Sequence, residues 1–116
     1  MRKRVLIVDD HEPIRAVARE LLESAGYVVT GEAADAAEAL AAVAAHAPDA
    51  VLLDVQLPDC DGFAVATELA AADGPTVVLI SSRDAEDYGR RVAACGARGF
   101  IPKSKLSAAA VAALLE

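Results

Sequence analysis

The sequence predicts an α/β domain built on a doubly wound sheet of five parallel strands, flanked by five helices. Two observations predict this fold class. Short apolar runs alternate with longer segments of helical spacing, and this alternation repeats five times along the chain. The apolar runs are also continuous rather than alternating with polar residues, which is typical of strands that are buried on both faces of a parallel sheet. Repeated strand–helix units imply right-handed crossovers between neighbouring parallel strands.

The chain has 116 residues and is expected to form one domain, residues 1–116. Its hydrophobic fraction is 55%, with only two Phe and two Tyr, so the core must consist mainly of Val, Leu, Ile and Ala. The apolar run Val5–Val8 is too short for a signal sequence or a membrane span, so we expect a cytoplasmic protein without membrane contact. The formal net charge of −7 argues against direct binding of nucleic acid, which needs a basic face.

Five apolar runs are the predicted strands. Turn residues bound each of them, and their lengths suit strands in a buried sheet. They are Val5–Val8, Tyr27–Val29, Ala50–Leu53, Val77–Ile80 and Phe100–Ile101.

The first two predicted helices have clear terminal signals. Pro13 suits the first turn of a helix that runs to about Ala25, and Gly26 ends it. Asp35 and Glu38 form a relative of the capping box, which opens a helix to about His46.

Three further helices complete the alternation. The third is expected from about Gly62 to Ala72. The fourth is expected to start near Asp84, because acidic residues in the first turn complement the helix dipole, and to stop at Gly96. The last is expected to start near Ser104 or Ser107 and to run to Leu115.

Polar side chains follow four of the predicted strands. Asp9 and Asp10 follow the first strand, Asp54 the third, Ser81 the fourth and Lys103 the fifth. In a doubly wound sheet the functional crevice lies beyond the carboxyl ends of the strands, where the strand order reverses. We therefore expect these side chains to converge at one edge of the sheet.

Three crowded carboxylates predict a cation. Two unit charges about 5 Å apart repel each other by roughly 3 kcal/mol at an effective dielectric constant near 20. A hard divalent cation relieves this repulsion, and a site with oxygen ligands alone favours Mg²⁺. A metal, a carboxylate nucleophile, a lysine and a hydroxyl are the groups that phosphoryl transfer needs.

Four segments of this chain resemble the motifs of bacterial response-regulator receiver domains, in the family's order and spacing. They are VLIVDDHEPIR, VLLDVQLPDCDGF, VVLISS and GARGFIPKSKL. The resemblance covers the whole chain. It implies a flavodoxin-like sheet with the strand order 2-1-3-4-5.

The resemblance implies a role for each residue at the acidic edge. Asp54 would be the phosphoacceptor. Asp10 and Asp54 would bind Mg²⁺ directly, Asp9 would act through a bound water, and the backbone carbonyl of Gln56 would complete the protein ligands. Lys103 would form an ion pair with the phosphoryl group.

Other positions match the family's switch and rate-tuning residues. Ser81 would hydrogen-bond a phosphoryl oxygen, and Phe100 would be the switch aromatic that fills the space left by Ser81. Gln56 and Arg83 would tune the rates of phosphorylation and dephosphorylation. The chain departs from the family in three places. Lys103 is followed by Ser104 rather than proline, which argues against the cis peptide bond common there. Phe100 lacks the hydroxyl of the commoner tyrosine, and Ser81 replaces threonine.

The implied function is a phosphorylation-dependent switch of a two-component system or phosphorelay. A sensor histidine kinase would phosphorylate Asp54, and the surface of the fourth helix, fifth strand and fifth helix would change to control an output. Such a domain is no ordinary enzyme, although it assists its own phosphorylation and slow autodephosphorylation. The GARGFIPKSKL segment resembles receivers of LuxR-type transcription regulators, which implies a C-terminal DNA-binding output domain outside this chain and a homodimer on phosphorylation.

Two alternatives remain open at this point. A pseudo-receiver would bind partners without being phosphorylated. A phosphohydrolase of the haloacid dehalogenase type also uses an aspartyl nucleophile, but it needs a second Asp two residues later, where this chain has Gln56.

Overall fold

A computed structural model describes residues 3–116, so the first two residues of the predicted domain lie outside the described residues. It confirms the predicted fold class: five parallel strands form one sheet in the order β2-β1-β3-β4-β5. The strands are β1 (Arg4–Val8), β2 (Val28–Ala33), β3 (Ala50–Asp54), β4 (Thr76–Ser81) and β5 (Gly99–Pro102).

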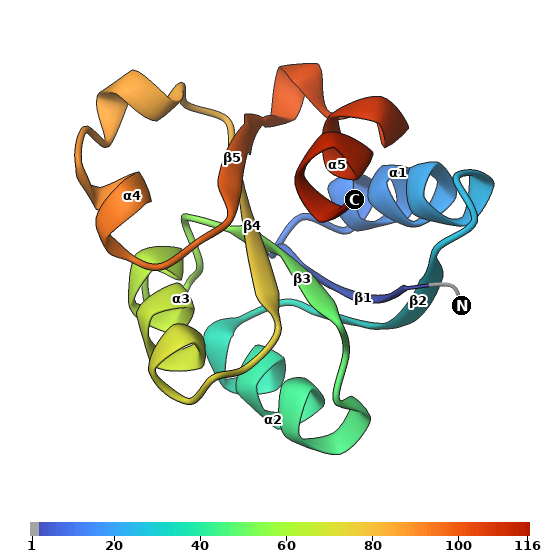
Figure 1. The fold of residues 1–116 in the computed structure, drawn as a ribbon, viewed down its shortest axis with the longest axis horizontal. Coiled ribbons are helices and arrows are strands. Elements are labelled where there is room, and N and C mark those ends of the chain that lie inside the picture. Colours follow the sequence, from blue (N-terminus) through green and yellow to red (C-terminus); the bar gives the residue numbers. More distant parts are fainter. Residues whose placement is uncertain (1–2) are drawn as a thin grey trace.

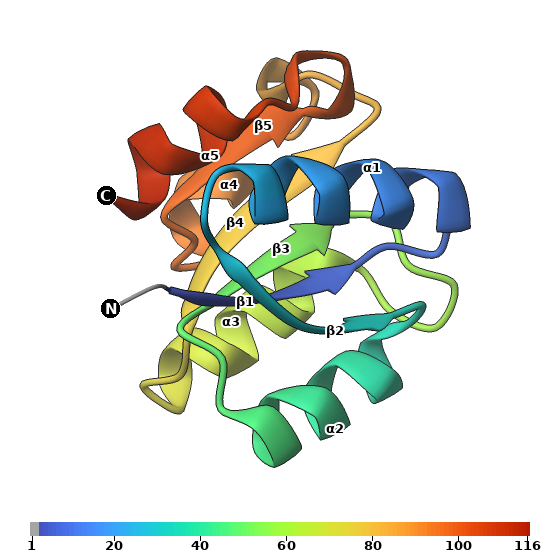
Figure 2. The same ribbon diagram turned by 90° about the vertical axis from the view of Figure 1, so that its right-hand side faces the viewer.

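The helices cover both faces of the sheet, as Figures 1 and 2 show. One face carries α1 and α5, and the other carries α2, α3 and α4. Their bounds are α1 (Glu12–Ser24), α2 (Ala36–His46), α3 (Gly62–Ala71), α4 (Arg91–Ala94) and α5 (Ala108–Leu115).

Burial explains why the central strands were easy to recognise in the sequence. Every residue of β3 is buried, and in β1 and β4 only the first residue is exposed. Alternate side chains of each strand enter two separate apolar clusters, one beneath α1 and α5 and the other beneath α2 and α3. A strand that is covered on both faces must be apolar throughout, because its side chains point alternately to the two faces.

The predicted capping signals operate in this structure. The Asp35 side chain accepts a hydrogen bond from the backbone N–H of Glu38 at 2.8 Å, and the Ser107 side chain accepts one from Ala110 at 3.0 Å. Ser107 is therefore the cap of α5, and the residues Lys103–Lys105 before it form a separate 3₁₀ turn. Gly26 follows α1 with a φ of +93°, a conformation that glycine adopts without steric cost.

The fourth helix is much shorter than the predicted span from Asp84 to Gly96, and this prediction was wrong. Residues Ala85–Asp87 form a 3₁₀ turn, and α4 contains only Arg91–Ala94. The Asp87 side chain accepts a hydrogen bond from the backbone N–H of Asp84, and Gly89 has a φ of +58°. A local side-chain bond and a left-handed glycine both compete with a continuous helix.

The longest helices of the described part, residues 3–116, are too short or too polar to cross a membrane.

Candidate functional site

The carboxyl ends of β1 and β3 bring two buried carboxylates to the same edge of the sheet. Asp54 is the last residue of β3, and Asp9 follows β1, where its backbone N–H donates a 3.0 Å hydrogen bond to the Ala33 carbonyl. Asp9 is 0% exposed and Asp54 is 2% exposed. Both carboxylates therefore sit at the end of a fully packed strand, where the backbone fixes their positions.

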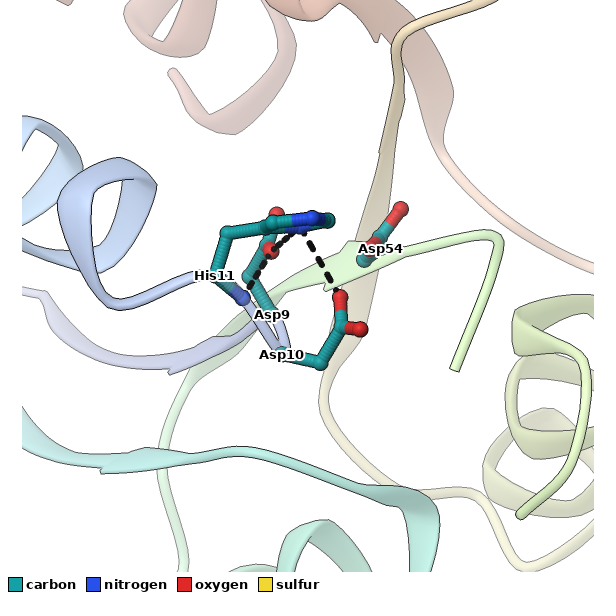
Figure 3. Close-up of side chains that lie close together, drawn as sticks. All are labelled: Asp9, Asp10, His11 and Asp54. Atoms are coloured by element: carbon teal, nitrogen blue, oxygen red, sulfur yellow. Dashed lines mark hydrogen bonds and ion pairs between the residues drawn. The ribbon is translucent and has the colours of Figure 1, made fainter. Parts of the chain in front are cut away.

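Asp10 and His11 join these two carboxylates, as Figure 3 shows. One ligand atom each from Asp9, Asp10, His11 and Asp54 lies within 4.8 Å of the others. The His11 ring Nδ1 lies 3.0 Å from Asp10 Oδ1 and 3.2 Å from Asp9 Oδ1. The backbone N–H of His11 also donates to Asp9 Oδ1 at 2.8 Å, so the turn after β1 folds around the Asp9 side chain.

Lys103 supplies the opposing charge from the end of β5. Its Nζ lies 2.7 Å from Asp9 Oδ2 and 3.4 Å from Asp54 Oδ2. The Lys103 side chain is only 13% exposed. One largely enclosed ammonium thus contacts two buried carboxylates, which leaves the group of three aspartates and one lysine with excess negative charge.

This charge environment shifts the pKa values of the site. Burial and then the neighbouring Asp9 raise the pKa of Asp54 from 3.8 to about 6, although Lys103 and the Gln56 backbone N–H oppose the shift. Burial alone would lower the pKa of Lys103, but the carboxylates of Asp9 and Asp54 outweigh it and raise that pKa. Near pH 7 the Asp54 carboxyl is therefore mainly ionised and remains easier to protonate than an exposed aspartate.

The donor set fits a small divalent cation. In octahedral coordination at 2.0–2.1 Å, neighbouring oxygen ligands lie roughly 3 Å apart and opposite ones roughly 4.2 Å apart. A cluster that spans 4.8 Å needs to contract only slightly to reach this geometry. Asp9 Oδ2 is buried 2.7 Å from the Lys103 ammonium, so this oxygen already faces a positive charge. Carboxylate oxygens favour Mg²⁺ in particular, and the residues that would hold it are Asp9, Asp10 and Asp54.

A pocket of about 390 Å³ opens over these groups. The residues that line it lie at or just after the ends of strands and at the start of α1. They are Asp10, His11, Ile14, Asp54, Gln56, Ser82 and Lys103. The pocket is large enough for a phosphoryl group together with bound water molecules, and its polar groups come from four different strand ends.

The predicted hydroxyl, Ser81, lies beside this pocket rather than in its lining. Ser81 ends β4 and is 1% exposed. Its Oγ lies 2.7 Å from the hydroxyl of Tyr88 and accepts a hydrogen bond from the Arg83 backbone N–H at 3.1 Å. The hydroxyl that lines the pocket belongs to Ser82.

Gly62 shapes the loop that follows Asp54. The backbone N–H of Gly62 donates to the Val55 carbonyl, and Gln56 pairs with Asp61 in an isolated antiparallel bridge. The backbone N–H of Gln56 donates a hydrogen bond to Asp54 Oδ1 at 3.2 Å. The loop therefore doubles back immediately, and it places the first turn of α3 against the backbone of the acidic residue.

The remaining predicted residues lie around this centre. Phe100 is half-buried on β5, next to Tyr88 rather than next to the carboxylates. Arg83 is exposed, and its backbone contacts Ser81. No described peptide bond is cis, so the Lys103–Ser104 bond is trans.

Sequence reasoning missed two contacts, because neither residue is among the predicted site residues. The His11 ring contacts both neighbouring aspartates. The Tyr88 hydroxyl contacts Ser81. The position of His11 beside the aspartate pair was a usable signal. The sequence around Tyr88 offers none, because that segment was expected to be helical.

Comparison with known proteins agrees with this geometry. Residues 5–114 match the family model described as the response regulator receiver domain. The chain is 39% identical over 115 residues to the probable transcriptional regulatory protein NarL of Mycobacterium tuberculosis. The matched region covers 97% of this chain and 53% of that protein. The chain thus spans about half the length of this relative.

Solved structures give the same result. The signal receiver domain of that NarL superposes with a TM-score of 0.86 at 34% identity, over 98% of this chain and 97% of the other. A chain of the CheX–CheY–BeF₃–Mg²⁺ complex from Borrelia burgdorferi superposes with a TM-score of 0.85 at 28% identity, over 97% of this chain and 86% of the other. The sheet order, the acidic edge and these matches together show that the chain belongs to the response regulator receiver domain family.

Proposed function

We propose that this receiver domain is a switch controlled by phosphorylation of Asp54. The observation that carries the proposal is the position of the Asp54 carboxylate, which lies in one cluster with Asp9, Asp10 and His11 and has Lys103 Nζ 3.4 Å away. A sensor histidine kinase would be the donor. The Asp54 oxygen attacks the phosphorus of a phosphohistidine, the P–N bond breaks, and its electron pair returns to the imidazole of the kinase.

The residues of this chain have distinct parts in that transfer. Asp54 must be ionised to attack, and its pKa of about 6 leaves it mainly ionised near pH 7. Lys103 neutralises part of the charge on the transferring oxygens, since its ammonium already contacts two carboxylates. Bound Mg²⁺ would offset the negative charge of the acids and of the phosphoryl oxygens. The Gln56 carbonyl as a ligand, and Gln56 and Arg83 as rate-tuning residues, belong to the same proposal.

The solved relatives support a phosphoryl site of this kind. The Borrelia complex named above contains BeF₃ and Mg²⁺. Beryllium fluoride has the shape and charge of a phosphoryl group, so a likeness to that structure favours phosphoryl chemistry at the matching edge of the sheet.

The proposed output is transcription, because the curated relatives of the chain are described as transcriptional regulators. A DNA-binding domain outside this chain would carry out that output, and a homodimer would form on phosphorylation. The cytoplasmic location expected from the sequence remains a prediction.

Mass spectrometry of the intact protein tests the proposal. The protein is incubated with Mg²⁺ and acetyl phosphate, and separately with a phosphorylated histidine kinase. We expect the addition of one phosphoryl group, which is absent in Asp54→Asn and when EDTA replaces Mg²⁺. A protein that gains no phosphoryl group from any donor would instead be a pseudo-receiver. Rapid turnover of many phosphate esters would identify a phosphohydrolase.

A further inference from the structure

The Tyr88 side chain contacts the hydroxyl of Ser81, which would bind the phosphoryl group once Asp54 is phosphorylated. Its hydroxyl lies 2.7 Å from Ser81 Oγ, and the Arg83 N–H donates to the same oxygen. Ser81 is 1% exposed, so water does not compete for this contact. Both partners of Ser81 thus come from the segment that follows β4, and neither comes from the pocket over Asp54.

The Tyr88 ring connects three parts of the fold. It packs edge-on against Phe63 of α3, with the ring centroids 5.2 Å apart. It also packs against Phe100 of β5 in a tilted arrangement, with the centroids 5.8 Å apart. The chain has only four aromatic residues, and three of them meet here. The fourth, Tyr27, donates its hydroxyl to Glu116. Phe100 has no hydroxyl, so the aromatic hydroxyl near Ser81 comes from Tyr88, in the segment between β4 and α4.

The same segment has little helical structure of its own to hold it in place. It consists of a 3₁₀ turn and the four residues of α4. Arg91 fixes it to α3, with its guanidinium 4.4 Å from the Phe63 ring centroid and an ion pair to Asp61 at 2.8 Å. A segment held by a few side-chain contacts rather than by a helix can change position at small cost.

We propose that Tyr88 is a positioning residue, which holds Ser81 away from the phosphoryl group until Asp54 is phosphorylated. This inference rests on the proposed function. A phosphoryl oxygen is a charged acceptor, and a hydrogen bond to a charged partner is roughly twice as strong as a neutral one. Ser81 therefore turns from Tyr88 to the phosphoryl group, and the Tyr88 hydroxyl moves out to water. The aromatic contacts with Phe63 and Phe100 then loosen, so the β4–α4 segment and β5 change together.

The inference changes the expected order of events at this site. The space beside Ser81 is already filled by the Tyr88 hydroxyl, so Phe100 can approach Ser81 only after Tyr88 has left. The state with Tyr88 bonded to Ser81 is the resting state. The net contribution of a neutral hydrogen bond corresponds to about a fivefold change in an equilibrium, so its loss should favour the phosphorylated arrangement by about that factor.

Tyrosine fluorescence tests this inference directly, because the chain contains no Trp and only two Tyr. In the full chain with Tyr27→Phe, Tyr88 is the only emitter, and its accessibility is measured by iodide quenching. We expect beryllium fluoride with Mg²⁺ to increase quenching of Tyr88. Adding Asp54→Asn should abolish this response, whereas adding Ser81→Ala should give high quenching before any addition.

The conservative variant Tyr88→Phe separates hydrogen bonding from packing, since it keeps the ring and removes the hydroxyl. We expect it to bind beryllium fluoride about fivefold more tightly than the wild type, with Tyr27→Phe as the matched control of unchanged affinity. Binding is measured independently by fluorine NMR. If the wild type binds no beryllium fluoride, both the proposed function and this inference are wrong. If it binds, but Tyr88 quenching does not change or Tyr88→Phe has wild-type affinity, only this inference is overturned.

Discussion

Gly62 lies directly against the backbone of Asp54. A Cβ atom at position 62 would lie 2.3 Å from the Asp54 carbonyl oxygen and 2.8 Å from the Val55 Cα. Real Cβ atoms do not approach backbone this closely, and backbone cannot move aside as a flexible side chain can. The position of the proposed phosphoacceptor therefore depends on the absence of a side chain eight residues later in the sequence.

This contact predicts that Gly62→Ala is strongly destabilising. The new methyl group must displace either α3 or the end of β3, and such overpacking costs about 1–3 kcal/mol or more. We expect the free energy of unfolding to fall by at least about 2 kcal/mol, measured by urea denaturation. The matched control is Gly31→Ala, where a Cβ would meet only the Leu6 side chain, at 3.9 Å. A Gly62→Ala protein as stable as Gly31→Ala would contradict the close approach of α3 to the end of β3.

Lys103 is expected to stabilise the fold as well as the site. Removing its charge in Lys103→Met leaves Asp9 and Asp54 buried together without a counter-ion. Breaking a buried ion pair in this way costs about 3–5 kcal/mol, and we expect about 2–4 kcal/mol because the lysine is partly exposed. Urea unfolding near pH 7 without Mg²⁺ measures the loss. Lys105→Met is the control, since Lys105 lies in the same 3₁₀ turn but is exposed.

A double-mutant cycle identifies the source of this loss. If the cost comes from the unpaired carboxylates, Asp9→Asn should restore much of the stability of Lys103→Met. The coupling free energy between positions 9 and 103 should then exceed about 1 kcal/mol. Additive effects would mean that the lysine stem, rather than its charge, supports the fold.

The accuracy of the sequence predictions depended on how deeply each element is buried. The central strands were predicted within one or two residues, because a strand covered on both faces reads as an apolar run. The edge strand β2 was predicted as Tyr27–Val29 but extends over Val28–Ala33. The residues missed by the prediction include Thr30, Gly31 and Glu32, none of which is buried, so no apolar run marks them.

The acidic edge was predictable for a geometric reason, and the Ser81–Tyr88 contact was not. Parallel strands end at the same edge of a sheet, so Asp9, Asp54 and Lys103 had to converge once the strands were known. The position of Tyr88 depends on the segment after β4. The acidic residues there resembled a helix start, but Asp87 bonds to the backbone of Asp84 instead and forms a turn.

Asp10 is predicted to bind the metal and to contribute little to the stability of the fold. Its side chain is 36% exposed, and its contact is with the His11 ring. Asp10→Ala removes one of three crowded negative charges, so the stability without metal should be unchanged or slightly higher. The affinity for Mg²⁺, measured by isothermal titration calorimetry, should fall at least about tenfold, and phosphorylation of Asp54 from acetyl phosphate should be lost. Glu68→Ala, an exposed change of equal charge on α3, is the control. Normal phosphorylation of Asp10→Ala would refute the metal assignment.

The raised pKa of Asp54 predicts a specific dependence of stability on pH. Burial and the charge of Asp9 raise this pKa from 3.8 to about 6 in the folded protein. The folded state therefore binds a proton at Asp54 more tightly than the unfolded state, and protonation stabilises the fold. This contribution is fully present below about pH 4 and is lost as the pH rises through about 6.

The variant Asp54→Asn isolates this contribution, because it removes the titration and keeps the shape of the side chain. In Mg²⁺-free buffer it should be more stable than the wild type near pH 7.5, by up to about 3 kcal/mol for a shift of about two pKa units. The difference should shrink steadily as the pH falls towards 4, since protonated Asp54 is then as neutral as asparagine. Urea unfolding of both proteins at several pH values measures it, and NMR of the Asp54 carboxyl carbon reports the pKa directly. A constant difference across this range would mean that Asp54 titrates normally, and that its burial between Asp9 and Lys103 does not disfavour the charge.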